Sequence, residues 1–199
     1  MYTLIQKPAP DFSAEAVMPN GEFSTIKLSD FQGEKYVALF FYPLDFTFVC
    51  PSEILAFSHR TKEFEERGVQ VLGISVDSKF SHHAWRQTPV EKGGIGDIQF
   101  PLLADITKEI SRDYGVLIDD SVALRGTFLI DKEGVVRHAT LNDLPLGRNV
   151  DETLRMVDAL QFTEKNGEVC PAGWKKGEVA MTPTQSGVSS YLQENASRL

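Results

Sequence analysis

The sequence predicts an α/β protein with a mixed central sheet flanked by helices, followed by a C-terminal arm. Two observations lead to this prediction: unbroken apolar runs alternate with amphipathic segments, and the composition changes after residue 162. With 199 residues, of which 42% are hydrophobic, the chain is long enough for one large core. We expect a main domain over residues 1–162 and an arm over residues 163–199.

The centre of the sheet is predicted from two apolar runs. Residues 36–42 are continuously apolar, which is typical of a strand covered on both faces, and residues 69–76 are similar. Between them a helix is expected over residues 51–67, with Pro51 at its start and Gly68 as its stop. A strand, a helix and a strand with short connections form a unit whose two strands are parallel.

The other elements follow from local signals. Asn20 and Gly21 are typical of a tight turn and predict an N-terminal hairpin of residues 12–17 with residues 22–28. The remaining expected elements are helices over 79–87, 107–114, 150–162 and 189–197, a strand over 100–104, and a hairpin of 127–131 with 135–141. Trp174 and Tyr191 lie in the polar arm and need a surface to cover them.

Composition excludes several classes of function. The net charge of −8 and the pI of about 5.0 argue against a general binder of nucleic acid or anionic membranes. Residues 36–42 are too few to span a membrane, and residues 1–10 lack the long apolar core of a secretory signal. Two cysteines are few for an extracellular disulfide scaffold, so we expect a reducing compartment, the cytoplasm.

Cys50 is the first candidate for chemistry. It ends the loop after the central strand and precedes a helix start, the edge of an α/β sheet where ligands bind. Free amide groups and the dipole at a helix N-terminus favour an anion such as a thiolate. Position alone leaves a reactive thiol and a buried structural cysteine equally open.

The residues before Cys50 favour the reactive thiol. Pro43, Thr47 and Cys50 have the spacing Pro-x-x-x-Thr-x-x-Cys. A hydroxyl three residues before the thiol can hydrogen-bond a thiolate and an oxygen atom approaching it, and the prolines restrict the loop. Thr47 could also simply cap the coming turn.

This segment resembles the active-site loop of the typical 2-Cys peroxiredoxins, the family of thioredoxin peroxidases and the alkyl hydroperoxide reductase C subunit. The resemblance spans nearly the whole chain and includes the motifs Phe-x-Phe-Val-Cys-Pro-x-Glu, Arg-Gly-Thr-Phe-Leu-Ile-Asp, Asn-Asp-Leu-Pro-x-Gly-Arg and Glu-Val-Cys-Pro-Ala-x-Trp. It implies an elaborated thioredoxin fold and peroxide reduction without a cofactor or metal.

The resemblance also implies roles for individual residues. Cys50 matches the peroxidatic cysteine and Cys170 the resolving cysteine, while Pro43, Thr47 and Arg125 match the supporting site. Glu53 and Arg148 are expected to orient these charged groups. On spacing alone, Arg125 is better explained as an ordinary surface charge at a strand end.

The family pattern implies an assembly. Cys170 would attack the Cys50 sulfenic acid of a partner subunit to form an intersubunit disulfide, which makes a two-fold dimer, and five such dimers often form a ring. The first turn of the helix after Cys50 would unwind for this contact. The reductant is thioredoxin by resemblance, with a flavoprotein disulfide reductase as the alternative.

A glycine-rich segment is a further point of resemblance. By itself it is a surface loop and lacks the spacing of a dinucleotide-binding motif. It is similar to the Gly-Gly-Leu-Gly loop of peroxiredoxins sensitive to hyperoxidation, with Ile95 in place of the leucine. The final helix of those relatives carries a Tyr-Phe pair where this chain has Tyr191 and Leu192, and we expect intermediate sensitivity here. The matching residues are Gly93, Gly94, Ile95 and Gly96 in the loop, and Tyr191 and Leu192 in the final helix.

Other functions fit the sequence less well. A disulfide reductase normally uses Cys-x-x-Cys, but here Glu53 stands where the second cysteine would be. The histidines show no metal-ligand spacing, and the adjacent pair is expected to decorate a helix; they are His59, His82, His83 and His138. A Cys–His hydrolase has no local signature, and a holdase chaperone activity of the oligomer is a secondary possibility.

Overall fold

The computed structural model describes residues 3–199, so the first two residues of the predicted domain and N-terminal segment lie outside it. The chain forms two compact units, Met1–Val150 and Asp151–Leu199. The change of composition predicts a boundary after residue 162, so the two divisions differ by one helix, which groups with the arm.

The first unit is built on a seven-stranded mixed sheet with the order β2-β1-β5-β4-β3-β8-β9. Strand β3 lies between β4, to which it is parallel, and β8, to which it is antiparallel. The strands are β1 (Ser13–Val17), β2 (Phe23–Lys27), β3 (Tyr36–Phe41), β4 (Val69–Ser75), β5 (Leu102–Ala104), β8 (Arg125–Ile130) and β9 (Val136–Asn142). The predicted mixed sheet and its parallel pair are confirmed.

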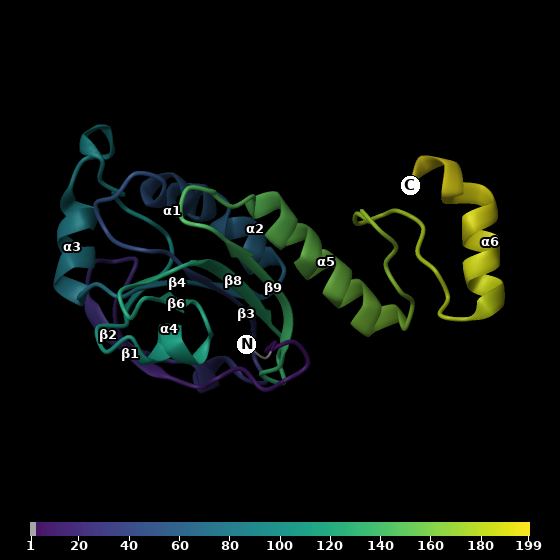
Figure 1. Ribbon diagram of the computed structural model, residues 1–199, viewed down its shortest axis with the longest axis horizontal. Helices are drawn as coiled ribbons and strands as arrows, with labels where there is room; N and C mark the ends of the chain where they lie inside the picture. Colours follow the sequence, from purple (N-terminus) through teal and green to yellow (C-terminus); the bar gives the residue numbers. More distant parts are fainter. Residues whose placement is uncertain (1–2) are drawn as a thin grey trace. The chain divides into compact units, whose positions relative to one another are not determined.

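Both faces of β3 are covered, which explains its unbroken apolar sequence. Val37 and Phe41 belong to a core cluster that includes Tyr114, the residue that ends helix α4 (Glu109–Asp113). On the other face, the Phe40 ring stacks on Phe57 of helix α1 (Cys50–His59) at 4.3 Å between centroids. Figure 1 shows α1 and α2 (Thr61–Glu66) along one side of the sheet and α4 on the other.

The predicted hairpins are confirmed. Strands β1 and β2 pair antiparallel around a turn in which Gly21 has a φ of +85°, a conformation that suits glycine. Strands β8 and β9 likewise form an antiparallel pair. A small pair, β6 (Leu117–Ile118) with β7 (Val122–Ala123), was not expected from the sequence.

The helix predicted over residues 51–67 is in fact two helices. Helix α1 already begins at Cys50, and the chain breaks at Arg60, with φ −105° and ψ 4°, before α2. The Thr61 hydroxyl donates to the Phe57 carbonyl at 3.2 Å, a local bond that competes with the helix backbone. The helix α3 (Lys79–Gln87) has the bounds that the sequence predicts.

The second unit contains the two longest helices of the described chain, α5 (Val150–Asn166) and α6 (Gln185–Asn195). Helix α5 extends beyond its predicted end at residue 162, whereas α6 begins before its predicted start at residue 189 and ends before residue 197. Helix α6 begins early because the Thr184 hydroxyl caps it by accepting from the Gly187 amide at 3.1 Å.

Three 3₁₀ turns complete the described elements of the two units: η1 (Leu28–Phe31), η2 (Val90–Lys92) and η3 (Ala196–Arg198).

The arm supplies part of the surface that its tryptophan needs. Trp174 is 2% exposed, and its ring lies 4.8 Å from that of Phe162 on α5. Its indole N–H donates to the Glu178 carbonyl at 3.0 Å, and Arg155 donates to the Trp174 carbonyl at 3.0 Å. Within residues 3–199, no helix has the length and apolarity that crossing a membrane requires.

Candidate active site

Cys50 is the first residue of α1 and is fully buried. It follows the loop that leaves the C-terminal end of β3, and Pro51 lies in the first turn of the helix, where a missing N–H costs nothing. No side chain caps this helix start. The thiol therefore lies where backbone amides and the helix dipole favour a negative charge.

The Thr47 hydroxyl contacts the thiol directly. Its Oγ1 atom lies 2.9 Å from Cys50 Sγ and 2.8 Å from the Leu44 carbonyl oxygen. The hydroxyl has one proton, and a carbonyl can only accept. When the sulfur is a thiolate, the proton can point to the sulfur, whereas a thiol can itself donate to Thr47 and leave the hydroxyl proton to Leu44.

Arg125 supplies a positive charge from a strand far along the chain. It is the first residue of β8 and is 3% exposed, so the interpretation as a surface charge is wrong. Its Nη1 atom lies 3.4 Å from Cys50 Sγ, and its Nε donates to the Leu144 carbonyl at 2.7 Å. A guanidinium at this distance stabilises an anionic sulfur.

Glu53 joins two arginines one turn after the thiol. Its carboxylate accepts from Arg125 Nη1 at 2.6 Å and from Arg148 Nε at 2.8 Å, and the Arg148 backbone N–H donates to it at 2.9 Å. All three side chains are at most 4% exposed. Two guanidinium groups and one carboxylate carry a net positive charge in the interior, which a thiolate at Cys50 would neutralise.

Arg148 is fixed by the ends of two strands. Its Nη1 donates to the Phe41 carbonyl at 2.7 Å and the Gly126 carbonyl at 2.8 Å, and its guanidinium carbon lies 5.1 Å from the centroid of the Phe40 ring. Burial lowers the pKa of Arg148, and the hydrogen bonds to Glu53 oppose that shift. Arginine nevertheless remains charged in proteins, so the cluster keeps its cation.

The expected loop residue Pro43 is buried two residues after the end of β3. The two phenylalanines on either side of Thr47 are exposed instead: the exposed fraction is 54% for Phe46 and 97% for Phe48. The loop thus has a buried base and an open apolar rim.

Cys170 lies in the second unit and is half-buried. Its Sγ is 3.6 Å from the Ala159 carbonyl oxygen and 3.7 Å from Thr163 Oγ1, both on α5. Both cysteines of the chain are free thiols.

The glycine-rich segment is more firmly held than a surface loop. Gly94 and Ile95 are buried, and the Ile95 amide donates to the Trp85 carbonyl at 3.3 Å. The Trp85 indole in turn donates to the Gly93 carbonyl at 2.8 Å. Gly96 closes the segment with a φ of +59°. The helix residues Tyr191 and Leu192 of the family comparison lie on α6, half-buried and exposed respectively.

A buried polar network beside the loop was not predicted. Asp45 Oδ2 lies 2.8 Å from His82 Nδ1, and the Tyr42 hydroxyl donates to Asp45 Oδ1 at 2.8 Å. His82 is fully buried, so the expectation that it decorates a helix surface is wrong. Burial raises the pKa of Tyr42, with Asp45 adding to the shift, which keeps the hydroxyl protonated as a donor. No spacing signal in the sequence connects these three positions.

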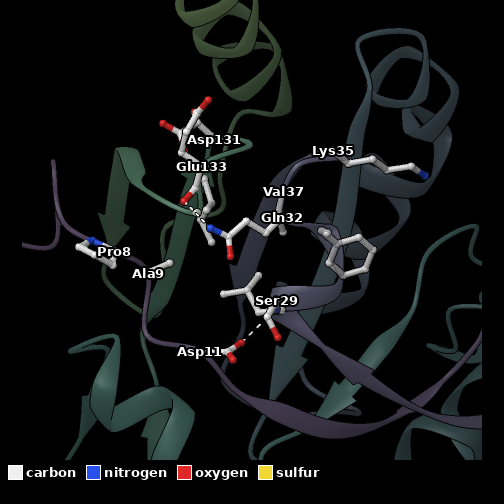
Figure 2. Close-up of a pocket in the computed structure, with 13 residues that line it drawn as sticks. Pro8, Ala9, Asp11, Ser29, Gln32, Lys35, Val37, Asp131 and Glu133 are labelled. Atoms are coloured by element: carbon white, nitrogen blue, oxygen red, sulfur yellow. Dashed lines mark hydrogen bonds between the residues drawn. The ribbon is translucent and has the colours of Figure 1, made fainter.

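A separate cavity of about 150 Å³ lies at the opposite end of β3 from the thiol (Figure 2). Val37 near the start of the strand lines it, together with Asp11 and Glu133. None of the predicted site residues contributes to it. Over residues 3–199 there is also no group of three or more His, Cys, Asp or Glu side chains placed to hold a metal ion.

A buried cysteine at a helix start, held between a hydroxyl and a guanidinium at the end of a central strand, characterises the thiol-dependent oxidoreductases. The family model "AhpC/TSA family" matches residues 5–139, and the model "C-terminal domain of 1-Cys peroxiredoxin" matches residues 159–194. The chain belongs to the AhpC/TSA family of peroxiredoxins.

Similar proteins support this assignment along the whole chain. Alkyl hydroperoxide reductase C of Helicobacter pylori is 59% identical over 98% of this chain and 100% of its own. The reduced 2-Cys peroxiredoxin of Plasmodium vivax superposes with a TM-score of 0.96 at 56% identity, covering 96% of this chain and 100% of its own. Plasmodium yoelii Prx1a, modified at its N-terminus, forms an artifactual octamer; it has a TM-score of 0.79 at 58% identity and covers 86% of this chain and 99% of its own.

The family fixes the fold and the class of reaction. The predicted thioredoxin fold is confirmed, and the chain is a thiol peroxidase that reduces peroxides.

Proposed function

We propose that the Cys50 thiolate attacks the terminal oxygen of hydrogen peroxide or an alkyl hydroperoxide. The S–O bond forms as the O–O bond breaks, so sulfur is oxidised to Cys50 sulfenic acid and the leaving oxygen departs as hydroxide or alkoxide, which takes a proton to become water or an alcohol. The observation that carries this proposal is the joint approach of Thr47 Oγ1 at 2.9 Å and Arg125 Nη1 at 3.4 Å to one sulfur.

The supporting residues have distinct parts in this step. Arg125 stabilises the thiolate and the charge that develops on the leaving oxygen. Thr47 can turn its proton from the Leu44 carbonyl to the sulfur or to the incoming peroxide, because its one hydroxyl reaches both protein acceptors. Glu53 and Arg148 orient Arg125, and Pro43 restricts the loop and the access of water.

For the second step we propose that Cys170 of a partner subunit attacks the Cys50 sulfenic acid. The products are an intersubunit disulfide and water. Cys50 lies in the first turn of α1 and is fully buried, so this turn must open before a second sulfur can reach it. Exchange of arms between identical subunits produces a two-fold dimer.

The reductant and the higher assembly are further parts of the proposal. Thioredoxin is the reductant suggested by the family resemblance, with a flavoprotein disulfide reductase as the alternative. For this chain we favour a decamer of five dimers, as the family resemblance implies; the octamer of N-terminally modified Plasmodium yoelii Prx1a is artifactual and does not bear on this choice. A reducing compartment, the cytoplasm, suits two free thiols.

The mechanism is tested by peroxide consumption with thioredoxin and its reductase, together with non-reducing gels of the oxidised protein. Wild-type protein is expected to turn over and to give a disulfide dimer. Cys170→Ser should lose the dimer band, and Cys50→Ser should lose both peroxide consumption and the dimer. Retained turnover in Cys50→Ser would exclude the mechanism, and a dimer without turnover would point to another reductant. With neither signal, suppression of aggregation by Cys50→Ser protein would test the chaperone alternative.

Hyperoxidation is the remaining part of the proposal. Slow opening of the first turn of α1 leaves Cys50 sulfenic acid exposed to a second peroxide, which gives sulfinic acid. Ile95 and Leu192, which depart from the pattern of the sensitive relatives, support an intermediate sensitivity. Mass spectrometry after turnover at increasing peroxide should detect sulfinic Cys50, and its absence at all concentrations would refute this part.

A further inference from the structure

The loop that carries Thr47 is anchored by side chains for which the proposed mechanism has no use. Asp45, two residues before Thr47, is 7% exposed. Its carboxylate is bound on both oxygens, by the Tyr42 hydroxyl at 2.8 Å and by His82 Nδ1 at 2.8 Å. A buried carboxylate in a loop is expensive unless it is paired, so this network is specific to one loop conformation.

The backbone of Asp45 is held as well. Its N–H donates to Asp77 Oδ2 at 2.8 Å, and the Ser75 hydroxyl donates to the same oxygen at 2.8 Å. Ser75 ends β4, so the anchor extends to the sheet beside β3. Asp45 is therefore fixed through its backbone and its side chain at once.

His82 brings helix α3 into the anchor. Its Nε2 lies 3.0 Å from the Leu103 carbonyl oxygen on β5. A carbonyl only accepts, so Nε2 carries a proton and Nδ1 faces the Asp45 carboxylate. The ring is thus held between the sheet and the loop.

The anchored residue precedes a strained one. Phe46 has a φ of +54°, a left-handed conformation that is unfavourable for an aromatic residue and persists only where the surroundings impose it. Its ring lies 5.7 Å from that of Trp85, also on α3. The next residue is Thr47, whose hydroxyl lies 2.9 Å from the Cys50 sulfur.

We propose that Asp45 and His82 are positioning residues, which hold the loop in the strained conformation that places the Thr47 hydroxyl on the Cys50 sulfur. This inference rests on the proposed roles of Cys50 and Thr47. It accounts for a buried histidine that contacts a carboxylate beside a loop whose chemistry needs no histidine. Neither residue contacts the sulfur, so their effect on the reaction passes through Thr47.

A double-mutant cycle tests that path. The background is full-length Cys170→Ser protein, in which Cys50 is the one thiol of the sequence. The rate at which this thiol is lost is measured after rapid mixing with hydrogen peroxide. Asp45→Ala should slow oxidation about tenfold, and adding Asp45→Ala to Thr47→Val should change the rate less than about twofold. If Asp45→Ala caused a structural defect that did not act through Thr47, it would slow oxidation by the same factor with and without Thr47→Val.

Two further variants separate position from stability. Asp45→Asn can accept from Tyr42 and donate to a neutral His82, so its rate should stay within about threefold of the background. Asp105→Ala is the matched control, because Asp105 is also a buried loop carboxylate, accepting from the Ile110 and Ser111 amides at 3.2 and 2.7 Å. Its oxidation rate should be unchanged.

The outcomes are distinct. If Asp45→Ala does not fold by circular dichroism, the cycle is run with His82→Gln, whose amide can reach Leu103 but not Asp45. Equal slowing in both backgrounds, or the same loss in Asp105→Ala, would overturn the positioning role. A background protein whose thiol survives peroxide would refute the proposed function itself. Slowing by Thr47→Val without slowing by Asp45→Ala would refute the positioning role alone.

Discussion

The Nη1 atom of Arg125 lies 3.4 Å from the Cys50 sulfur, although 75 positions separate the two residues. The contact arises because β8 is antiparallel to β3, so the start of β8 lies beside the end of β3, where the thiol loop begins. The pairing of strands in the sheet, not a local sequence motif, therefore brings the guanidinium to the thiol.

Arg125→Lys should therefore reduce peroxide consumption strongly. Lysine keeps the charge, but its single nitrogen cannot take the places of both Nε, which donates to Leu144, and Nη1, which donates to Glu53 and Cys50. We expect the second-order rate with hydrogen peroxide to fall by about 10²-fold, the usual cost of one lost charge-stabilising donor. Arg112→Lys, at an arginine whose side chain is 54% exposed, is the control and should retain the wild-type rate. A wild-type rate in Arg125→Lys would mean that charge alone suffices.

The Thr47 hydroxyl is tested by two substitutions of similar size. Thr47→Ser keeps the O–H that reaches both the sulfur and the Leu44 carbonyl, whereas Thr47→Val removes it. We expect Thr47→Ser to stay within a few-fold of the wild-type rate and Thr47→Val to lose about 10²-fold. Stopped-flow measurement of the first turnover distinguishes the two variants, and equal rates for both would show that the hydroxyl is not required.

The sequence predicts the scaffold better than it predicts the charge cluster. The apolar run of residues 36–42 is sufficient to identify a central strand, because burial of both faces leaves a local signature. The thiol and Thr47 are also local, three positions apart in one loop. Their partners at Arg125 and Arg148 are recognisable only by family resemblance, since their approach depends on strand order.

The misses have the same physical origin. His82 looks like a surface residue on α3 because its partner, Asp45, is 37 positions away in the sequence. The break at Arg60 leaves no signal in the sequence, because it depends on a hydrogen bond from the Thr61 hydroxyl and no glycine or proline marks it. Contacts in the folded protein determine both features, and the hydrophobic periodicity of the sequence does not reveal them.

Glu53→Gln should destabilise the first unit. The substitution removes the one carboxylate that accepts from both Arg125 and Arg148, and it leaves two buried cations facing each other. We expect the free energy of unfolding in urea to fall by about 3 kcal/mol. The control is Glu15→Gln in the exposed pair with Lys79, which should change it by less than about 1 kcal/mol. A similar small change in both variants would indicate that the buried cluster has another source of compensation.

Gly94→Ala tests how tightly the glycine-rich segment is packed. A Cβ atom at Gly94 would lie 1.8 Å from the Thr88 carbonyl oxygen, so the backbone must move. We expect a loss of about 1–3 kcal/mol in the free energy of unfolding, accompanied by a change in the environment of Trp85, which donates to Gly93. Gly33→Ala, with a φ of +83° and open space around it, should cost about 1 kcal/mol and leave Trp85 fluorescence unchanged.

The stability of Asp77→Asn relative to the wild type should depend on pH. Burial raises the pKa of the Asp77 carboxyl, and the charge of Asp45 adds to the shift, so the folded protein holds this proton more tightly than the unfolded chain. The side chain therefore contributes most below the pKa of an unfolded aspartate, about 3.9, and that contribution is lost as the pH rises through the higher folded value.

Asparagine does not titrate, but its amide oxygen can still accept from the Asp45 N–H and the Ser75 hydroxyl, as Asp77 does. The free energy of unfolding of Asp77→Asn minus that of the wild type should consequently be more positive at neutral pH than in acid. Urea titrations of both proteins across this range measure the difference directly. A difference that stayed constant, or that grew in acid, would show that the hydrogen bonds to the charged carboxylate outweigh its burial.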